Sequence, residues 1–225
     1  MKNKKVVLAS LVTALIASTP VIADWSKAAS LLGGDNNKTT QNGAIESQNA
    51  FLAQFVSSSK TITDAQLLAA KSLNLDEMAA KIEAERKAKD GQSVEQLKTA
   101  KETGSNLNSA IEKAMKDGVK LDADSKKLYL EALVQYSVGL VQTKSVVDSA
   151  PGFLSSAKDT ISSASMTEKL SVTGKLEDGM YVAKEIPAYA KSLWDTSNLM
   201  ISFAKSNDIE VPADATKALS GMSFN

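Results

Sequence analysis

Three pairs of residues in this chain have the spacing of a serine nucleophile and its lysine partner. The pattern Ser-x-x-Lys occurs at Ser57/Lys60, Ser155/Lys158 and Ser202/Lys205. On a helix this spacing places a hydroxyl and an amine on one face, as serine acyl enzymes of the penicillin-binding type require. The Ser-Asp-Asn and Lys-Thr-Gly elements that accompany the pattern in those enzymes are missing from the sequence. We therefore interpret the three pairs as a product of a composition rich in serine and lysine.

Histidine and cysteine are both absent from the 225 residues. Without them the chain has no Ser-His-Asp or Cys-His catalytic group, no Cys/His zinc site and no disulfide. A carboxylate-bridged metal pair in a helical bundle also needs histidine, as Glu-x-x-His on two helices. The sequence therefore predicts a protein that is not an enzyme and has no metal or cofactor. Acid–base chemistry by Asp, Glu or Lys is the enzymatic alternative.

The first 23 residues have the three parts of a secretory signal peptide. They comprise a basic start at residues 2–5, an apolar run at 6–17 and a short cleavage region that ends at Ala23. The apolar run is shorter than the roughly 20 residues that a membrane-spanning helix needs. We expect export and cleavage after Ala23, with no stable membrane anchor left. The expected location is the periplasm, and release to the medium is the alternative.

The charges of the chain are balanced and evenly mixed. Lys and Arg number 26, Asp and Glu number 26, and residues 1–23 contain three lysines and no acidic residue. The mature chain is therefore slightly acidic. Nucleic acid and anionic lipid are bound by clustered Lys and Arg, so neither is expected as a partner.

Beyond the signal peptide the sequence has helical patterning. We expect a flexible N-terminal segment over residues 24–43 and a helical bundle domain over 44–225, in which apolar residues recur at spacings of three and four. The expected helices cover residues 44–60, 63–91, 93–118, 122–151, 153–165, 167–186 and 187–206, the fifth being a short helix or a connection. No stretch alternates with a period of two. The sequence therefore predicts an all-α, antiparallel bundle of about five to seven helices.

The helix expected over 122–151 is the most apolar, so it should lie at the centre of the bundle. Asp122 or Asp124 can cap its start, and Pro151 is expected to end it. Further along, Pro187 can be the first residue of the last helix or a kink in one long helix.

One internal similarity appears when the chain is shifted by 90 positions. Residues 95–127 then align with 185–217, and the connector at 119–124 aligns with that at 209–214. The shared pattern is a helix, a connector with two aliphatic residues, and an aspartate that can cap the next helix. A true duplication and convergence on a useful connector both explain it, and both give two similar helical hairpins.

The clearest heptad-like seam consists of five residues spaced alternately by three and four: Leu97, Ala100, Gly104, Leu107 and Ile111. The small residues among them would let a second helix approach closely. We predict that this seam binds a partner, either an envelope protein or a second copy of the chain.

Five aromatic residues lie in the C-terminal half, at Tyr129, Tyr136, Tyr181, Tyr189 and Trp194. They are the predicted ligand-binding residues, because phenol and indole groups along an apolar pocket can orient a ligand. The alternative is that they form the core. The function expected from the sequence is therefore protein–protein interaction or self-assembly after export, without catalysis. The alternative is a carrier of an apolar small molecule or lipid in a cavity between helices.

Overall fold

A computed structural model of the chain describes residues 37–88, 93–213 and 216. The described residues form five α-helices and no strand: α2 (Asn37–Ser72), α3 (Asp76–Ala88), α4 (Ser93–Lys116), α5 (Ala123–Ser163) and α6 (Lys169–Ser206). The predicted all-α bundle is confirmed. None of these helices is both long and apolar enough to cross a membrane. The predicted signal peptide and residues 24–36 lie outside the described residues.

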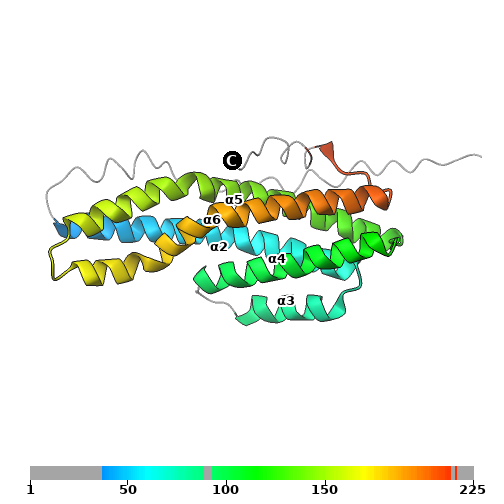
Figure 1. Ribbon diagram of the computed structural model, residues 1–225, viewed down its shortest axis with the longest axis horizontal. Helices are drawn as coiled ribbons and strands as arrows, with labels where there is room; N and C mark the ends of the chain where they lie inside the picture. The colour runs from blue at the N-terminus through cyan, green and yellow to red at the C-terminus, as the bar shows by residue number, and fades with distance from the viewer. Residues whose placement is uncertain (1–36, 89–92, 214–215, 217–225) are drawn as a thin grey trace, which may run out of the picture.

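Four helices form an elongated bundle, and α3 lies on its outside (Figure 1). Helix α2 packs against α5 and α4, and α6 packs against the same two helices, so α4 and α5 are diagonal to each other. Helices α2, α4 and α6 run in one direction, and α3 and α5 run in the other. Helix α4 begins near the middle of α2, so it accompanies α2, α5 and α6 along one end of the bundle and does not reach the other end (Figure 1). We call these the four-helix end and the three-helix end, the latter comprising residues 37–55, 146–163 and 169–183.

Two helices, α2 and α5, are longer than the sequence predicts, and the single helix predicted over residues 63–91 is divided between the end of α2 and α3. Helix α2 begins at Asn37, within the segment expected to be flexible, and it continues without a break between residues 60 and 63. Ile62 is fully buried there and leaves no room for a side chain at Gly139 of α5, since a Cβ at that position would lie 2.7 Å from its Cδ1. This contact between α2 and α5 keeps the helix continuous where the local pattern predicted a break.

Helix α5 continues past Pro151, where the prediction ended it. Pro151 lies on the exposed side, whereas Ala150 and Phe153 are buried. The proline ring therefore meets solvent, and burial of the neighbouring apolar residues outweighs the single backbone hydrogen bond that proline removes. In α6, Pro187 lies inside one long helix, which was one of the two predicted alternatives.

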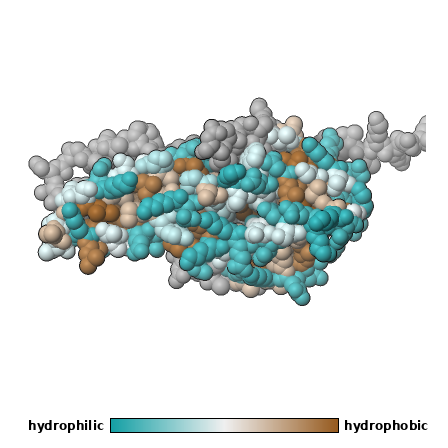
Figure 2. Space-filling model, in the orientation of Figure 1, coloured by the Kyte–Doolittle hydropathy of each residue, from teal (hydrophilic) through white to brown (hydrophobic). Residues whose placement is uncertain are grey.

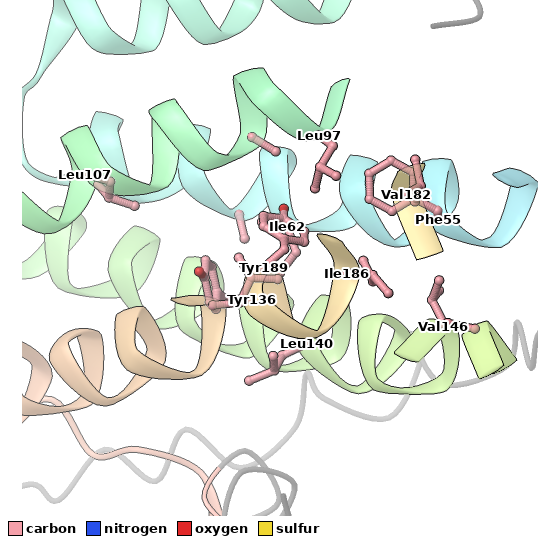
Figure 3. Close-up of a cluster of buried hydrophobic side chains, with 14 of the residues drawn as sticks. Phe55, Ile62, Leu97, Leu107, Tyr136, Leu140, Val146, Val182, Ile186 and Tyr189 are labelled. Carbon is pink, nitrogen blue, oxygen red and sulfur yellow. The ribbon is translucent and has the colours of Figure 1, made fainter. Parts of the chain in front are cut away.

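The central position of α5 is confirmed. It packs against both α2 and α6, and large side chains on its inner face, such as Leu133, Tyr136 and Leu140, are fully buried (Figure 3). Its start is capped as predicted by Asp122, whose Oδ1 accepts hydrogen bonds from the backbone N–H of Ser125 at 2.8 Å and of Asp124 at 3.1 Å.

Helices α2, α4 and α6 end in the same backbone turn. The residues with positive φ are Asn74 (55°), Gly118 (65°) and Asp208 (55°). The hydrogen bond that closes each turn is 2.9 Å long and joins Leu75 N to Ala70 O, Val119 N to Ala114 O, and Ile209 N to Ala204 O. This is the left-handed helix ending that glycine favours and that Asn and Asp tolerate. The turn at Gly118 thus has a counterpart at Asp208, 90 residues later.

The two connectors related by this 90-residue shift contact each other at the four-helix end. The backbone N–H of Leu121 donates to Oδ1 of the buried Asn207 at 2.8 Å. The Lys120 ammonium group donates to the Ser206 carbonyl. These bonds join the end of α6 to the start of α5, and they fix the relative position of the two connectors.

Candidate functional site

Three of the five aromatic candidates lie in the core. Tyr129, Tyr136 and Tyr189 are fully buried. The Tyr129 hydroxyl donates to the Met200 carbonyl at 3.1 Å, and its ring packs against Phe203 with ring centres 5.1 Å apart. Desolvation raises the pKa of Tyr129 well above its ordinary value. This residue therefore joins α5 to α6 and has no atom free to meet a ligand.

Tyr136 and Tyr189 face each other across the middle of the bundle (Figure 3). Their phenol oxygens are buried and lack a well-formed hydrogen bond among the described residues. The hydroxyl of Thr196 lies beside Tyr136, and that of Ser59 lies beside Tyr189. Burial raises the pKa of both phenols, and the neighbouring hydroxyls oppose this only in part. The two residues add polar atoms to a core that also contains the buried amide of Gln66.

The other two aromatic candidates do not join this group. Tyr181 is 38% exposed on α6. Trp194 is half-buried, and its indole N–H is buried without a partner among the described residues. The structure therefore brings Tyr136 and Tyr189 together, places Tyr129 nearer the end of α6, and leaves Tyr181 on the surface.

The predicted partner-binding seam is covered by the chain itself. Leu97, Ala100, Gly104, Leu107 and Ile111 are all buried, because α4 lays this face against α2 and α6. Close approach at a small residue, as the sequence predicted, does occur. The Gln66 Nε2 of α2 lies 3.5 Å from the position of a Cβ at Gly104. The helix that meets the seam belongs to the same molecule.

At the three-helix end, a side chain of α2 bonds the backbone of α6. Gln48 Nε2 donates to the Lys175 carbonyl at 2.7 Å, and its Oε1 accepts from the Gly179 N–H at 3.1 Å. These are the two groups that an α-helix normally joins to each other. We call this contact the Gln48 clasp. A side chain in the hydrogen-bond ladder and an internal proline both bend helices, and α6 bends in this region (Figure 1).

The turn between α5 and α6 lies at the predicted boundary between the helices 153–165 and 167–186. The feature that the sequence did not predict is the exposure of two large apolar side chains there, Met166 at 94% and Leu170 at 86%. We call residues 164–170 the tip. Apolar surface is visible at this end of the molecule in Figure 2. The signal available in the sequence was Ser165-x-x-Glu168, since Glu168 Oε2 accepts from the backbone N–H of Ser165 at 3.2 Å as in a capping box.

The three Ser-x-x-Lys pairs lie on the outer face of the bundle. All six residues are exposed. The Ser202 hydroxyl donates to the Asn198 carbonyl at 2.8 Å, so it is engaged by its own helix. Among the described residues, no group of three or more Asp or Glu side chains is arranged to hold a metal ion.

Comparison of the chain with protein-family models, with curated proteins and with solved structures gives no match. The candidate surfaces therefore rest on the geometry of this chain alone.

Proposed function

We propose that the chain is an exported, non-enzymatic helical protein that acts by binding another protein through its tip. The observation that carries the proposal is the exposure of Met166 (94%) and Leu170 (86%). Single exposed apolar residues are common on protein surfaces. Here two large side chains four residues apart are exposed at the turn that joins α5 to α6. Burial of both against a partner would supply a substantial part of a binding free energy.

The expected partner is an envelope protein or a second copy of the chain. Export rests on the signal-like pattern of residues 1–23. The surroundings of the tip suit contact with a protein, because Ser162, Ser163 and Thr167 are exposed and can form the polar rim of an interface.

The test is site-specific photo-crosslinking of the full chain in the envelope of its own host. A photoreactive amino acid is placed at Thr167, within the tip, and as a control at the exposed Glu112 of α4. We expect a discrete adduct from position 167 and none from 112. Adding Met166→Ser and Leu170→Ser should reduce that adduct by about fivefold or more. An adduct of twice the chain mass identifies self-assembly, and any other mass identifies a partner protein.

Equal adducts from both positions, or an adduct that the serine substitutions do not change, would contradict this proposal. A chain that yields no adduct at position 167 would contradict it as well.

A carrier of an apolar molecule is the second candidate. What favours it is the pair of phenol oxygens at Tyr136 and Tyr189, which a polar group of a ligand could satisfy. Native mass spectrometry of the protein from its host separates the two candidates. A retained small-molecule mass that Tyr136→Phe with Tyr189→Phe abolishes would support the carrier over the tip.

A further inference from the structure

Helix α3 is held to the bundle by a small apolar cluster, and its partly buried Met78 packs against both this cluster and the main core. Its buried side chains among the described residues are Ala79 and Ile82, which pack with Leu67 and Ala70 of α2. The main core is formed by α2, α4, α5 and α6. In Figure 1, α3 lies outside the four-helix arrangement. An element with so few buried apolar side chains is expected to be among the first to open locally.

Three ion pairs complete the attachment, and each joins α3 to a neighbouring helix. They are Arg86–Asp64 at 2.8 Å, Lys71–Glu83 at 2.7 Å and Lys81–Glu102 at 2.7 Å. Five of the six side chains are at least 40% exposed. Exposed ion pairs stabilise weakly and are screened by salt. The attachment of α3 is therefore sensitive to ionic strength in a way that the apolar core is not.

The surface beneath α3 has the chemistry of a groove for an amphipathic helix. Leu67 and Ala70 supply an apolar strip on α2. Charged groups lie around it: Asp64 on α2 and Glu102 on α4 pair with cations of α3, and Lys71 on α2 pairs with Glu83 of α3. A helix that fits has two apolar residues about one turn apart and cationic residues on each side of them. Recognition of a helix through apolar anchors and flanking charges is a recurring mode of binding.

We propose that α3 is a releasable cover, and that the α2–α4 surface beneath it binds an amphipathic, cationic-flanked helix of a partner protein. In the free chain α3 occupies this surface as an internal ligand. A partner helix binds only to chains in which α3 has left this surface. The apparent affinity for the partner is therefore the affinity of the uncovered surface multiplied by the fraction of chains in which it is uncovered. This second surface is independent of the tip at Met166 and Leu170.

The first test measures release of α3 by hydrogen exchange in the full chain. Lys81→Gln with Arg86→Gln removes two cations of α3 and leaves the groove intact. The matched control is Lys113→Gln with Lys144→Gln, which removes two cations from ion pairs within α4 and α5. We expect amide exchange in residues 77–86 to accelerate about tenfold in the first variant and to remain unchanged in the control. Raising NaCl from about 0.05 M to about 0.5 M should accelerate the same amides in the unmodified chain.

The second test adds the sequence of α3 to the protein as a separate peptide. The probe is a fluorescent synthetic peptide of residues 76–88 with blocked ends, and the control peptide carries Ile82→Asp. We expect saturable binding of the probe to the Lys81→Gln, Arg86→Gln chain, about tenfold weaker binding to the control chain, and no binding of the Ile82→Asp peptide.

The proposal would be overturned if the amides of residues 77–86 exchanged hydrogen only at the same rate as those of α5. In that case α3 would open only when the whole protein unfolds. Failure of the probe to bind the opened chain would overturn it too, as would equal binding to both chains. None of these measurements involves the tip, so the outcome is separable from that of the crosslinking experiment.

Discussion

The two ends of the bundle are stabilised in different ways. The four-helix end contains the three buried tyrosines, the three left-handed helix endings and the bonded connectors at Leu121 and Asn207. The three-helix end relies on the Gln48 clasp and on the stacked rings of Phe51 and Phe153, whose centres are 5.1 Å apart. The tip, with the most exposed apolar side chains described, belongs to the three-helix end. The four-helix end therefore holds the helix endings and connectors in place, and the three-helix end presents the surface proposed for binding.

The largest expected effect acts on the four-helix end and comes from alkaline pH. Burial raises the pKa of Tyr129, Tyr136 and Tyr189 above the ordinary 10.0, so the folded state keeps protons that the unfolded state loses. Their contribution to stability is present in full below pH 10 and falls as the pH rises further. We expect loss of helical circular dichroism at strongly alkaline pH, together with the 295 nm absorbance of three tyrosinates. Gradual ionisation of all tyrosines with unchanged helicity would contradict this prediction.

A single core substitution should have the next largest effect. Leu133 of α5 is fully buried between α2 and α6. Leu133→Ala should lower the free energy of unfolding by about 2–5 kcal/mol, through lost burial and a residual cavity. Val138 on the same helix is 48% exposed, and Val138→Ala should change it by about 0.5 kcal/mol or less. Denaturant unfolding measures both free energies. Similar losses of stability from the two substitutions would contradict the central position of α5 in the fold.

The sequence predicted some kinds of contact in the bundle better than others. Spacings of three and four located the helices, and the cap at Asp122 followed from one residue. The seam from Leu97 to Ile111 was correctly recognised as a close-packing face. Its partner could not be read from the pattern, because a seam looks the same whether the opposite helix belongs to the same chain or to another.

The three-helix end was predicted less well, and the reasons are physical. Gln48 is a polar residue at a buried position, and only the position of α6 shows that its amide has backbone partners. Leu170 lies two residues before the buried Val172, so it is on nearly the opposite face of the helix, in the first turn of α6 at the tip. Periodicity identifies an apolar face, whereas burial also requires another element to cover it.

Two glycines of α6 allow a matched test of the three-helix end: Gly179, whose N–H takes part in the Gln48 clasp, and Gly174, which directly precedes Lys175. A Cβ at Gly179 would lie 2.5 Å from Gln48 Oε1 and 2.7 Å from Phe153 Cζ, whereas a Cβ at Gly174 meets nothing within 4 Å. Gly179→Ala should therefore destabilise the protein by about 1–3 kcal/mol. Gly174→Ala should stabilise it by about 0.5–1 kcal/mol, because alanine favours the helix. Thermal unfolding of the two variants gives the comparison, and equal shifts would show that the clasp contributes nothing.

The smallest expected effects concern the helix endings of the four-helix end. Gly118 has φ of 65° with open space around it, so Gly118→Ala should cost about 1 kcal/mol through backbone strain alone. Asp208 has nearly the same φ, 55°, without being glycine. Asp208→Gly should therefore raise stability by about 0.5 kcal/mol, since relief of strain exceeds the added freedom of the unfolded chain. Opposite signs in equilibrium unfolding would establish that the two positions, 90 residues apart, perform the same local task. If both substitutions changed the free energy of unfolding in the same direction, different interactions would hold the same backbone conformation at the two positions. The two connectors would then be alike only in their hydrogen bonds.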